Sequence, residues 1–206
     1  VAAGAYDEDD ALVGFVFGMT GLRDGEVVHW SDMLAVRPEV RDAGLGRRLK
    51  AFQRGEMMTR GVEKMYWTFD PLQSRNAYLN FSRLGVVARE YVRDMYGDSD
   101  SPLHRGIGTD RLVALWLLSS DRVGERVAAK VAVASSSFDD DTPVALAAER
   151  GGTHPRPGAQ DLTVGNDLVR VAIPSDIVTL LNDDLVLAQE WRAATRHVLS
   201  HYLESG

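Results

Sequence analysis

A chain of 206 residues with a formal net charge of -7 is long enough for one domain, or for one domain with an extension. Its 30 acidic residues outnumber 23 lysines and arginines, which argues against a nucleic-acid-binding protein, because such proteins usually carry a basic face. Without cysteine the chain has no disulfides and no thiolate sites, and without an apolar run of ~20 residues it has no membrane-spanning helix. We therefore expect a cytoplasmic protein that binds neither membrane nor metal.

The first three predicted elements are strands. Residues 1–6 and 11–19 are short apolar segments separated by four acidic residues, a pattern typical of a hairpin. A third extended run covers residues 27–36 and ends at Arg37-Pro38, because proline lacks a backbone donor. His29 and Asp32 lie in this run an odd number of residues apart, so we expect them on opposite faces of the strand.

The pattern then changes to that of a helix, which ends near Gly61. Leu45, Leu49 and Phe52 recur at helical spacing and predict its buried face. Basic side chains are predicted on its other faces: Arg47, Arg48, Lys50 and Arg54.

Alternation returns over residues 62–69, which predicts a strand with Met65, Trp67 and Phe69 on one side. A short helix over residues 76–84 and a buried strand over residues 112–118 follow. Antiparallel strands that lead into a strand–helix–strand crossover imply a mixed α/β fold, with helices packed on a mixed sheet.

The character of the chain changes after residue 118. Residues 121–133 are compatible with a helix, and the segment rich in serine, aspartate, glycine and proline from Ser135 to Gly158 is typical of a surface loop or linker. A strand over residues 168–173 and closing helices that begin near Pro174 complete the pattern. An apolar stripe on these helices is predicted to be core: Leu181, Leu185, Ala188, Trp191, Val198 and Tyr202. We therefore expect a core over residues 1–118 and a C-terminal extension over residues 119–206.

The most informative segment joins the third strand to the first long helix. Two glycines, Gly44 and Gly46, open the helix next to several arginines. A helix N-terminus presents unpaired N–H groups and the positive end of its dipole, so this junction predicts a phosphate-binding cradle. A dinucleotide-binding fold is the obvious rival, but its fingerprint requires a third glycine where this chain has Leu49.

The run Arg41-Asp42-Ala43-Gly44-Leu45-Gly46 resembles the R/Q-x-x-G-x-G/A signature of GNAT acyltransferases. The resemblance implies a central mixed, mostly antiparallel twisted sheet with splayed central strands and helices on both faces. It also implies acetyl-CoA or another acyl-CoA as co-substrate, with pantetheine between the splayed strands and pyrophosphate at the glycine turn. The residues that would bind it are Leu34, Ala35, Val36, Arg41, Ala43, Gly44, Leu45, Gly46 and Arg47.

A second part of the GNAT pattern follows at Asn76, which opens a run that ends at Leu84-Gly85. In the superfamily this asparagine hydrogen-bonds pantetheine, although helix capping is an alternative for Asn76. Shorter runs, among them residues 67–72 and 109–112, resemble a subgroup with a C-terminal extension, some members of which are thought to acylate amino acids, including with succinyl groups. The superfamily places a strand and two helices before the opening hairpin, so we expect N-terminal elements to be missing here.

The resemblance leaves the catalytic groups open. Many GNAT enzymes use as general acid a tyrosine at the position that Phe81 occupies here, and phenylalanine donates no proton. Tyr78 is our first substitute, ahead of Tyr91 and Tyr96. Asp32 is our first candidate for the general base, because it aligns with a histidine of the arylalkylamine branch of the superfamily.

Asp70 is a second candidate for the base or for binding the substrate ammonium, with a cap on the turn at Pro71 as the structural alternative. An ion-pair turn is the favoured interpretation of Thr109-Asp110-Arg111, ahead of a substrate clamp.

The function that we expect is transfer of an acetyl or succinyl group to a primary amine of a small molecule or amino acid. Two alternatives stay open: an acyl-CoA-binding regulatory module with little catalysis, and an NAD(P)-binding protein. A homodimer formed through the closing helices is compatible with the sequence.

Overall fold

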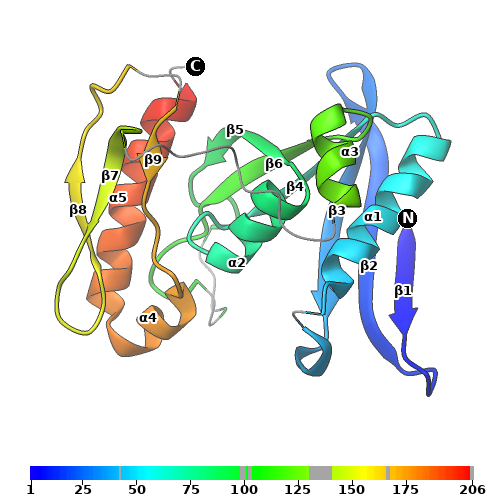
Figure 1. Ribbon diagram of the computed structural model, residues 1–206, viewed down its shortest axis with the longest axis horizontal. Helices are drawn as coiled ribbons and strands as arrows, with labels where there is room; N and C mark the ends of the chain where they lie inside the picture. The colour runs from blue at the N-terminus through cyan, green and yellow to red at the C-terminus, as the bar shows by residue number, and fades with distance from the viewer. Residues whose placement is uncertain (42, 98–100, 102–103, 130–140, 166–167, 205–206) are drawn as a thin grey trace. The chain divides into compact units, whose positions relative to one another are not determined.

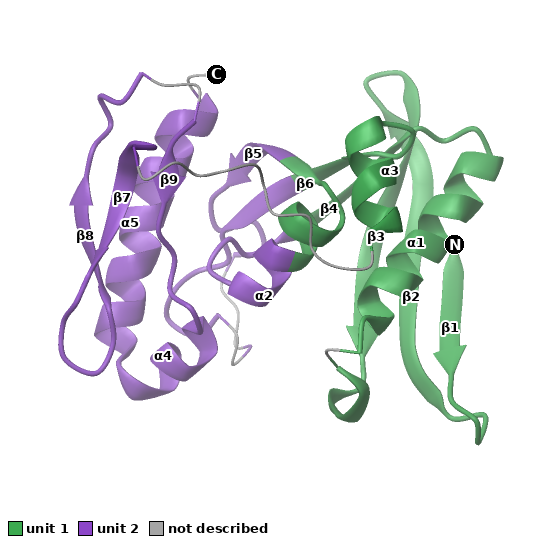
Figure 2. Ribbon diagram, viewed as in Figure 1, with its two compact units in different colours: residues 1–68, 79–87, 114–133 green, residues 69–78, 88–113, 134–206 purple. Residues whose placement is uncertain are grey.

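The computed structural model describes the chain except for residues 42, 98–100, 102–103, 130–140, 166–167 and 205–206 (Figure 1). It divides into two compact units that interleave along the sequence (Figure 2). Unit 1 comprises residues 1–68, 79–87 and 114–133, and unit 2 comprises residues 69–78, 88–113 and 134–206. The division into 1–118 and 119–206 stays a prediction.

The larger sheet has six strands in the order β1-β2-β3-β4-β6-β5. Its first three strands form an antiparallel meander: β1 (Ala2–Tyr6), β2 (Leu12–Arg23) and β3 (Glu26–Val36). Asp24 and Gly25 join β2 to β3 with φ angles of 52° and 81°, as a tight two-residue hairpin requires. The predicted hairpin and third strand are confirmed.

Helix α1 (Leu45–Thr59) follows β3 after a short 3₁₀ turn, η1 (Pro38–Val40), and packs against β1, β2 and β3. The predicted helix is confirmed, but two of its residues are oriented differently from the prediction. Lys50 is 3% exposed, whereas Phe52 is 54% exposed. The sheet covers the stripe that contains Leu49, Lys50, Gln53 and Met57, so a basic residue occupies a core-facing position.

Strand β4 (Lys64–Phe69) is parallel to β3 and buries Met65, Trp67 and Phe69, as predicted. The helix predicted over residues 76–84 is instead α2 (Ser74–Ala77) followed by a π-helical turn, η2 (Tyr78–Arg83). The wider turn is closed by the N–H of Leu84, which donates to the carbonyl of Leu79, five residues earlier.

Two strands and a helix follow: β5 (Val87–Val92), β6 (Arg111–Leu117) and α3 (Asp121–Ala128). β5 was not predicted, because its sequence VAREYV alternates poorly. Gly85 precedes it with φ of 73°, and a Cβ there would lie 3.1 Å from Arg126 Cγ of α3. Both the backbone conformation and the close approach of α3 therefore favour glycine.

Unit 2 contains a three-stranded sheet, two strands of which lie where the sequence predicted a loop or linker over residues 135–158; the third lies within the strand predicted over residues 168–173. Its strands are β7 (Val144–Glu149), β8 (Arg156–Gln160) and β9 (Arg170–Val171), in the order β8-β7-β9. The prediction was wrong over β7 and β8 because β7 is alanine-rich, which hides its alternation, and because β8 contains both proline and glycine. Residues 135–140 lie outside the described residues.

Helices α4 (Ile177–Asp183) and α5 (Leu185–Glu204) complete unit 2. Asp176 caps α4 by accepting hydrogen bonds from the N–H groups of Val178 and Thr179. Most of the predicted apolar stripe belongs to the core around Trp191, but Leu185 is 42% exposed at the first turn of α5. The structure thus confirms a mixed α/β fold with helices flanking the sheet. None of the described helices is long and apolar enough to cross a bilayer.

Candidate functional site

Strands β3 and β4 run side by side for only a short distance in unit 1. The parallel register pairs His29 with Met65 and Trp30 with Tyr66 and extends no further. β3 continues to Val36, and β4 continues beyond Tyr66. The backbone groups on the β4 side of the later part of β3 are thus not used by β4, as the predicted splay requires.

The N-terminus of α1 lies beside this free end of β3. Gly44 is its N-cap residue with φ of 78°, and no side chain caps the helix. A Cβ at Gly44 would meet no atom within 4 Å, so backbone conformation, not packing, explains the glycine. A Cβ at Gly46 would lie 3.7 Å from Leu34 Cδ2, which places the first turn of α1 against β3. The N–H groups of this turn have no side-chain cap, which is the arrangement that the predicted anion cradle needs.

Three arginines lie near the cradle and differ in their hydrogen-bond partners and exposure. Arg41 donates from Nε to the carbonyl of Val36 at 3.1 Å, and Arg47 donates to the carbonyl of Ala129 at 2.5 Å. Arg48 is exposed. Asp42 lies outside the described residues. Of the predicted cofactor-binding set, the backbone of residues 34–36 and residues 43–46 are therefore brought together, whereas Arg47 is engaged with the end of α3.

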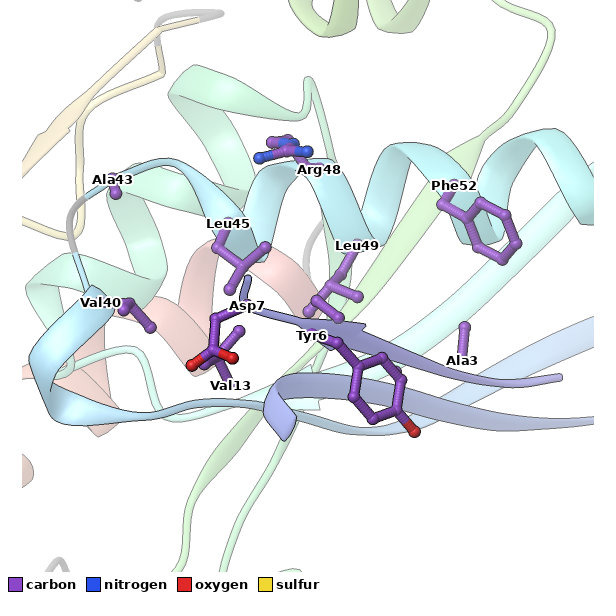
Figure 3. Close-up of a pocket in the computed structure, with 12 residues that line it drawn as sticks. Ala3, Tyr6, Asp7, Val13, Val40, Ala43, Leu45, Arg48, Leu49 and Phe52 are labelled. Carbon is purple, nitrogen blue, oxygen red and sulfur yellow. The ribbon is translucent and has the colours of Figure 1, made fainter. Parts of the chain in front are cut away.

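A pocket of about 540 Å³ opens beside the first two turns of α1 (Figure 3). In Figure 3, Leu45 and Leu49 point from α1 toward β1 and β2, and Tyr6 and Asp7 come from the end of β1. Ala43 also lines it, next to Gly44. The pocket therefore extends the surface around the cradle with a largely apolar wall.

Asp32 lies at an irregularity of β3 that the sequence does not reveal. Phe17 of β2 pairs with Met33, but Met19 pairs with Trp30, so β3 has one extra residue between them. This β-bulge breaks the alternation on which the prediction of opposite faces for His29 and Asp32 was based. His29 is buried, and Asp32 is exposed.

A buried polar network in unit 1 was not predicted. Lys50 Nζ donates to Ser31 Oγ at 2.7 Å and lies 3.6 Å from the ring centroid of Trp67. Ser31 Oγ donates in turn to Gln53 Oε1 at 2.8 Å, and Gln53 Nε2 lies 3.1 Å from His29 Nε2. Lys50 and Gln53 are three residues apart and therefore lie on one face of α1. His29 and Ser31 are two residues apart and therefore lie on one face of β3. These two spacings in the sequence could have revealed the network.

Burial sets the ionisation of this network. It lowers the pKa of Lys50 to about 7. Burial first, and then the N-terminal amino group and Lys50, lower the pKa of His29 to about 4. His29 is therefore neutral at pH 7; because the amide of Gln53 donates to Nε2, the proton lies on Nδ1, 3.0 Å from Thr20 Oγ1. A lone histidine here is structural.

Asp70 belongs to unit 2 and is 3% exposed. Its Oδ2 accepts from Arg192 at 2.7 Å, and its Oδ1 accepts from the N–H of Leu72 at 2.9 Å. His104 Nδ1 and Arg111 NH1 lie 3.8 and 4.0 Å from Oδ2. Both carboxylate oxygens thus have partners, one in the turn cap and one in a buried ion pair.

Asp110 forms a second ion pair of unit 2. It belongs to the segment Thr109-Asp110-Arg111, for which the sequence favoured an ion-pair turn. It accepts from Arg196 Nε at 2.7 Å and from Tyr91 Oη at 2.5 Å. Although burial alone would raise it, the pKa of Asp110 is lowered by the hydrogen bonds from Arg196 and Tyr91. Burial and the hydrogen bond to Asp110 raise the pKa of Tyr91, so its proton is held against release.

The remaining predicted residues are mostly on the surface. Asn76 is exposed in α2, and Tyr78 is 54% exposed where α2 meets η2. Tyr96 is 58% exposed, with the guanidinium carbon of Arg111 5.1 Å from its ring centroid. Phe81 is half-buried in η2. Within the described part of the chain, no three histidine, aspartate or glutamate side chains gather in a way that could hold a metal ion.

Comparison with known proteins gives matches of structure only. No family model matches the chain, and no curated protein matches its sequence. It is similar to a solved structure of the NatC complex bound to Gag peptide and CoA, with 12% identity, a TM-score of 0.48, and coverage of 56% of this chain and 70% of the other.

Two further solved structures are similar over a comparable share of the chain. The ribosomal-protein-S18-alanine N-acetyltransferase of Escherichia coli is 18% identical, with a TM-score of 0.46 and coverage of 58% of this chain and 70% of the enzyme. Nourseothricin acetyltransferase is 20% identical, with a TM-score of 0.45 and coverage of 56% and 63%. Each likeness covers little more than half of this chain.

Proposed function

We propose that this chain is a GNAT-type N-acyltransferase that transfers an acyl group from acyl-CoA directly to a primary amine of a small molecule or amino acid. The observation that carries the proposal is the parting of β3 from β4 after two residue pairs, beside a helix N-terminus opened by Gly44. The cradle fits a pyrophosphate, because its N–H groups are uncapped by side chains and a Cβ at Gly44 would project into open space.

The residues of unit 1 divide the work of binding. Within Leu34–Val36, Leu34 and Val36 present their backbone groups on the side of β3 that β4 leaves, for the amide groups of pantetheine, apart from the Val36 carbonyl that accepts from Arg41. The turn at Gly44 and Gly46 supplies N–H donors for the pyrophosphate. Arg48, which is exposed, adds positive charge near the pocket of Figure 3.

Acyl-CoA supplies an activated thioester, so positioning contributes much of the rate. The amine nitrogen forms a bond to the acyl carbon as the carbon–sulfur bond breaks; the amine loses a proton and the thiolate gains one. Asp32, exposed at the bulge of β3, is our candidate to accept the amine proton. Tyr78 is the candidate donor to the thiolate, because Phe81 has no proton to give. Asp70, with both oxygens partnered, is the weaker candidate for the base.

Thermal unfolding with CoA, acetyl-CoA, succinyl-CoA and NAD tests the cofactor class, since a ligand selective for the native state raises the midpoint. We expect the CoA compounds, but not NAD, to raise it. A shift with NAD that CoA does not displace would support the dinucleotide alternative, and no shift with any CoA compound would overturn the proposal.

The second candidate function, an acyl-CoA-binding module without efficient catalysis, is favoured by Phe81. Mass spectrometry of an amine panel incubated with acyl-CoA separates the two, because only the enzyme forms acylated product. In an active protein, Asp32→Asn should lower turnover about 100-fold with unchanged CoA affinity. Full turnover in Asp32→Asn would remove Asp32 as the base.

A further inference from the structure

Lys50 is a buried cation at the base of the splay between β3 and β4. Its Nζ lies between Ser31 on β3 and Trp67 on β4, the residues that directly follow the last paired positions of the two strands. Only 3% of Lys50 is exposed. The side chain therefore reaches from α1 to the point where the two strands part.

The groups around Lys50 accept hydrogen bonds from only some of its N–H donors. An ammonium group has three N–H donors. In the described part of the chain, Ser31 Oγ is the one hydrogen-bond acceptor for Lys50. Its oxygen is free to accept because the hydroxyl proton of Ser31 is directed to Gln53. The face of Trp67 gives a favourable cation–π contact. At least one N–H has no described acceptor.

No negative charge balances Lys50 within the described residues. The groups that face it are Ser31 and, behind it, His29 from β3, Trp67 from β4, and Gln53 from α1 itself. Of these only His29 titrates, and it is neutral at pH 7. Desolvation alone accounts for the lowered pKa of Lys50, with no acidic group to oppose it. A buried cation without a counterion is costly, and a ligand that brings an anion removes that cost.

The position of Lys50 indicates which part of a ligand reaches it. From Val36, next to the cradle, to Ser31 the strand β3 spans about 17 Å, a length comparable with an extended pantetheine arm. A thioester bound as proposed above thus lies near Ser31, and the far end of its acyl group points to the base of the splay. An acceptor amine that arrives from solvent has no such route to a side chain that is 3% exposed.

We propose that Lys50 determines acyl specificity by pairing with a terminal carboxylate, so that the preferred donor is the CoA thioester of a short dicarboxylic acid such as succinyl-CoA. This inference rests on the proposed function, because it places the acyl group between β3 and β4. Ser31 orients the ammonium, and Trp67 covers the methylene groups of the acyl chain.

Calorimetry with succinyl-CoA and butyryl-CoA tests the inference, since the two acyl groups have similar length and differ in the terminal charge. The wild type should bind succinyl-CoA about tenfold or more tightly than butyryl-CoA. Lys50→Met should abolish this preference while it retains affinity for CoA itself. Lys64→Met is the matched control, because Lys64 lies on β4 in an exposed ion pair with Glu26; it should keep the preference.

Proton uptake gives a second readout that a merely structural lysine would not show. At pH 8 Lys50 is mostly neutral, so pairing with a carboxylate should take up close to one proton, measured from binding enthalpies in phosphate and Tris buffers. Butyryl-CoA should take up none, and neither ligand should do so with Lys50→Met.

The outcomes separate the two proposals. Binding of CoA with equal affinities for succinyl-CoA and butyryl-CoA would overturn the inference and leave the proposed function intact. Absence of binding for every CoA compound would overturn both. A melting temperature of Lys50→Met at or above that of the wild type would show that any loss of preference does not come from unfolding.

Discussion

The two compact units treat buried charge in opposite ways. In unit 2, Asp70 and Asp110 are each buried, and each is matched by an arginine of α5, Arg192 or Arg196. In unit 1, Lys50 is equally buried and has no acidic partner among the described residues. The N-terminus of α1 likewise has no side-chain cap and no acidic residue in its first turn.

We interpret the paired charges of unit 2 as structural and the unpaired charge of unit 1 as available for ligand binding. A buried charge that is paired with an opposite charge within the protein holds elements together, and removing one partner leaves the other uncompensated. A buried positive charge that the protein leaves unmatched gains its partner only when an anion binds. The four predictions below test this contrast: three change one of the buried charges or a group that contacts it, and one adds a charge at the end of α1.

Breaking the pair in unit 2 should have the largest effect. Asp70→Asn leaves Arg192 buried without its counterion, so the free energy of unfolding should fall by about 3–5 kcal/mol in urea titrations. Glu190→Gln is the control on the same helix, because its pair with Arg156 is exposed; it should cost less than about 1 kcal/mol. Equal costs for the two variants would contradict an architectural role for Asp70.

Removing the unmatched charge of unit 1 should instead stabilise the protein. Lys50→Met replaces a desolvated ammonium by an apolar chain of similar length, so the free energy of unfolding should rise by about 2 kcal/mol at pH 6. The gain depends on pH with a definite sign. Between about pH 7, the folded pKa, and the ordinary lysine value of 10.5, the unfolded wild type binds the extra proton, so wild-type stability rises with pH.

The gap between Lys50→Met and wild type should therefore be largest below pH 7 and should shrink as the pH rises toward 10. Urea titrations at pH 6, 8 and 9.5 measure it. A gap that stays constant over this range would mean that Lys50 has an ordinary pKa in the folded protein.

An acid placed at the uncapped end of α1 should weaken the binding of CoA. Gly44→Asp puts a carboxylate beside the N–H groups of the cradle, so CoA affinity should fall about tenfold or more, while the thermal midpoint changes little. Gly44→Asn is the matched variant, since asparagine has the same shape, tolerates positive φ and carries no charge. Calorimetry that finds equal losses for the two variants would assign the effect to shape instead of charge.

Sequence patterns predicted the cradle because its signal is local. The end of β3 just before Arg37-Pro38, the two glycines and the start of the helix after them are all encoded within about a dozen residues, and the structure places these elements as expected. The burial of Lys50 was not predicted, because it depends on which side of α1 the sheet covers. That tertiary contact outweighs the apolar spacing of Leu45, Leu49 and Phe52.

Two other misses have similar causes. The bulge in β3 depends on its register with β2, which no single strand reveals. Strands β7 and β8 were mistaken for a loop because pairing across the hairpin stabilises segments that have weak strand propensity by themselves.

The smallest expected effect is the coupling energy between Lys50 and Ser31, compared with that between Asp70 and Arg192. Ser31→Ala removes the one described acceptor of Lys50 and the donor to Gln53, and it should cost about 1–2 kcal/mol. In the Lys50→Met background the same change should cost less, because only Gln53 then loses a partner. This double-mutant cycle should give a coupling energy near 1 kcal/mol or below, whereas the cycle of Asp70→Asn with Arg192→Met should give a clearly larger one. If Ser31 and Lys50 were coupled as strongly as Asp70 and Arg192, the network of unit 1 would be complete by itself, and Lys50 would have no need of a ligand carboxylate.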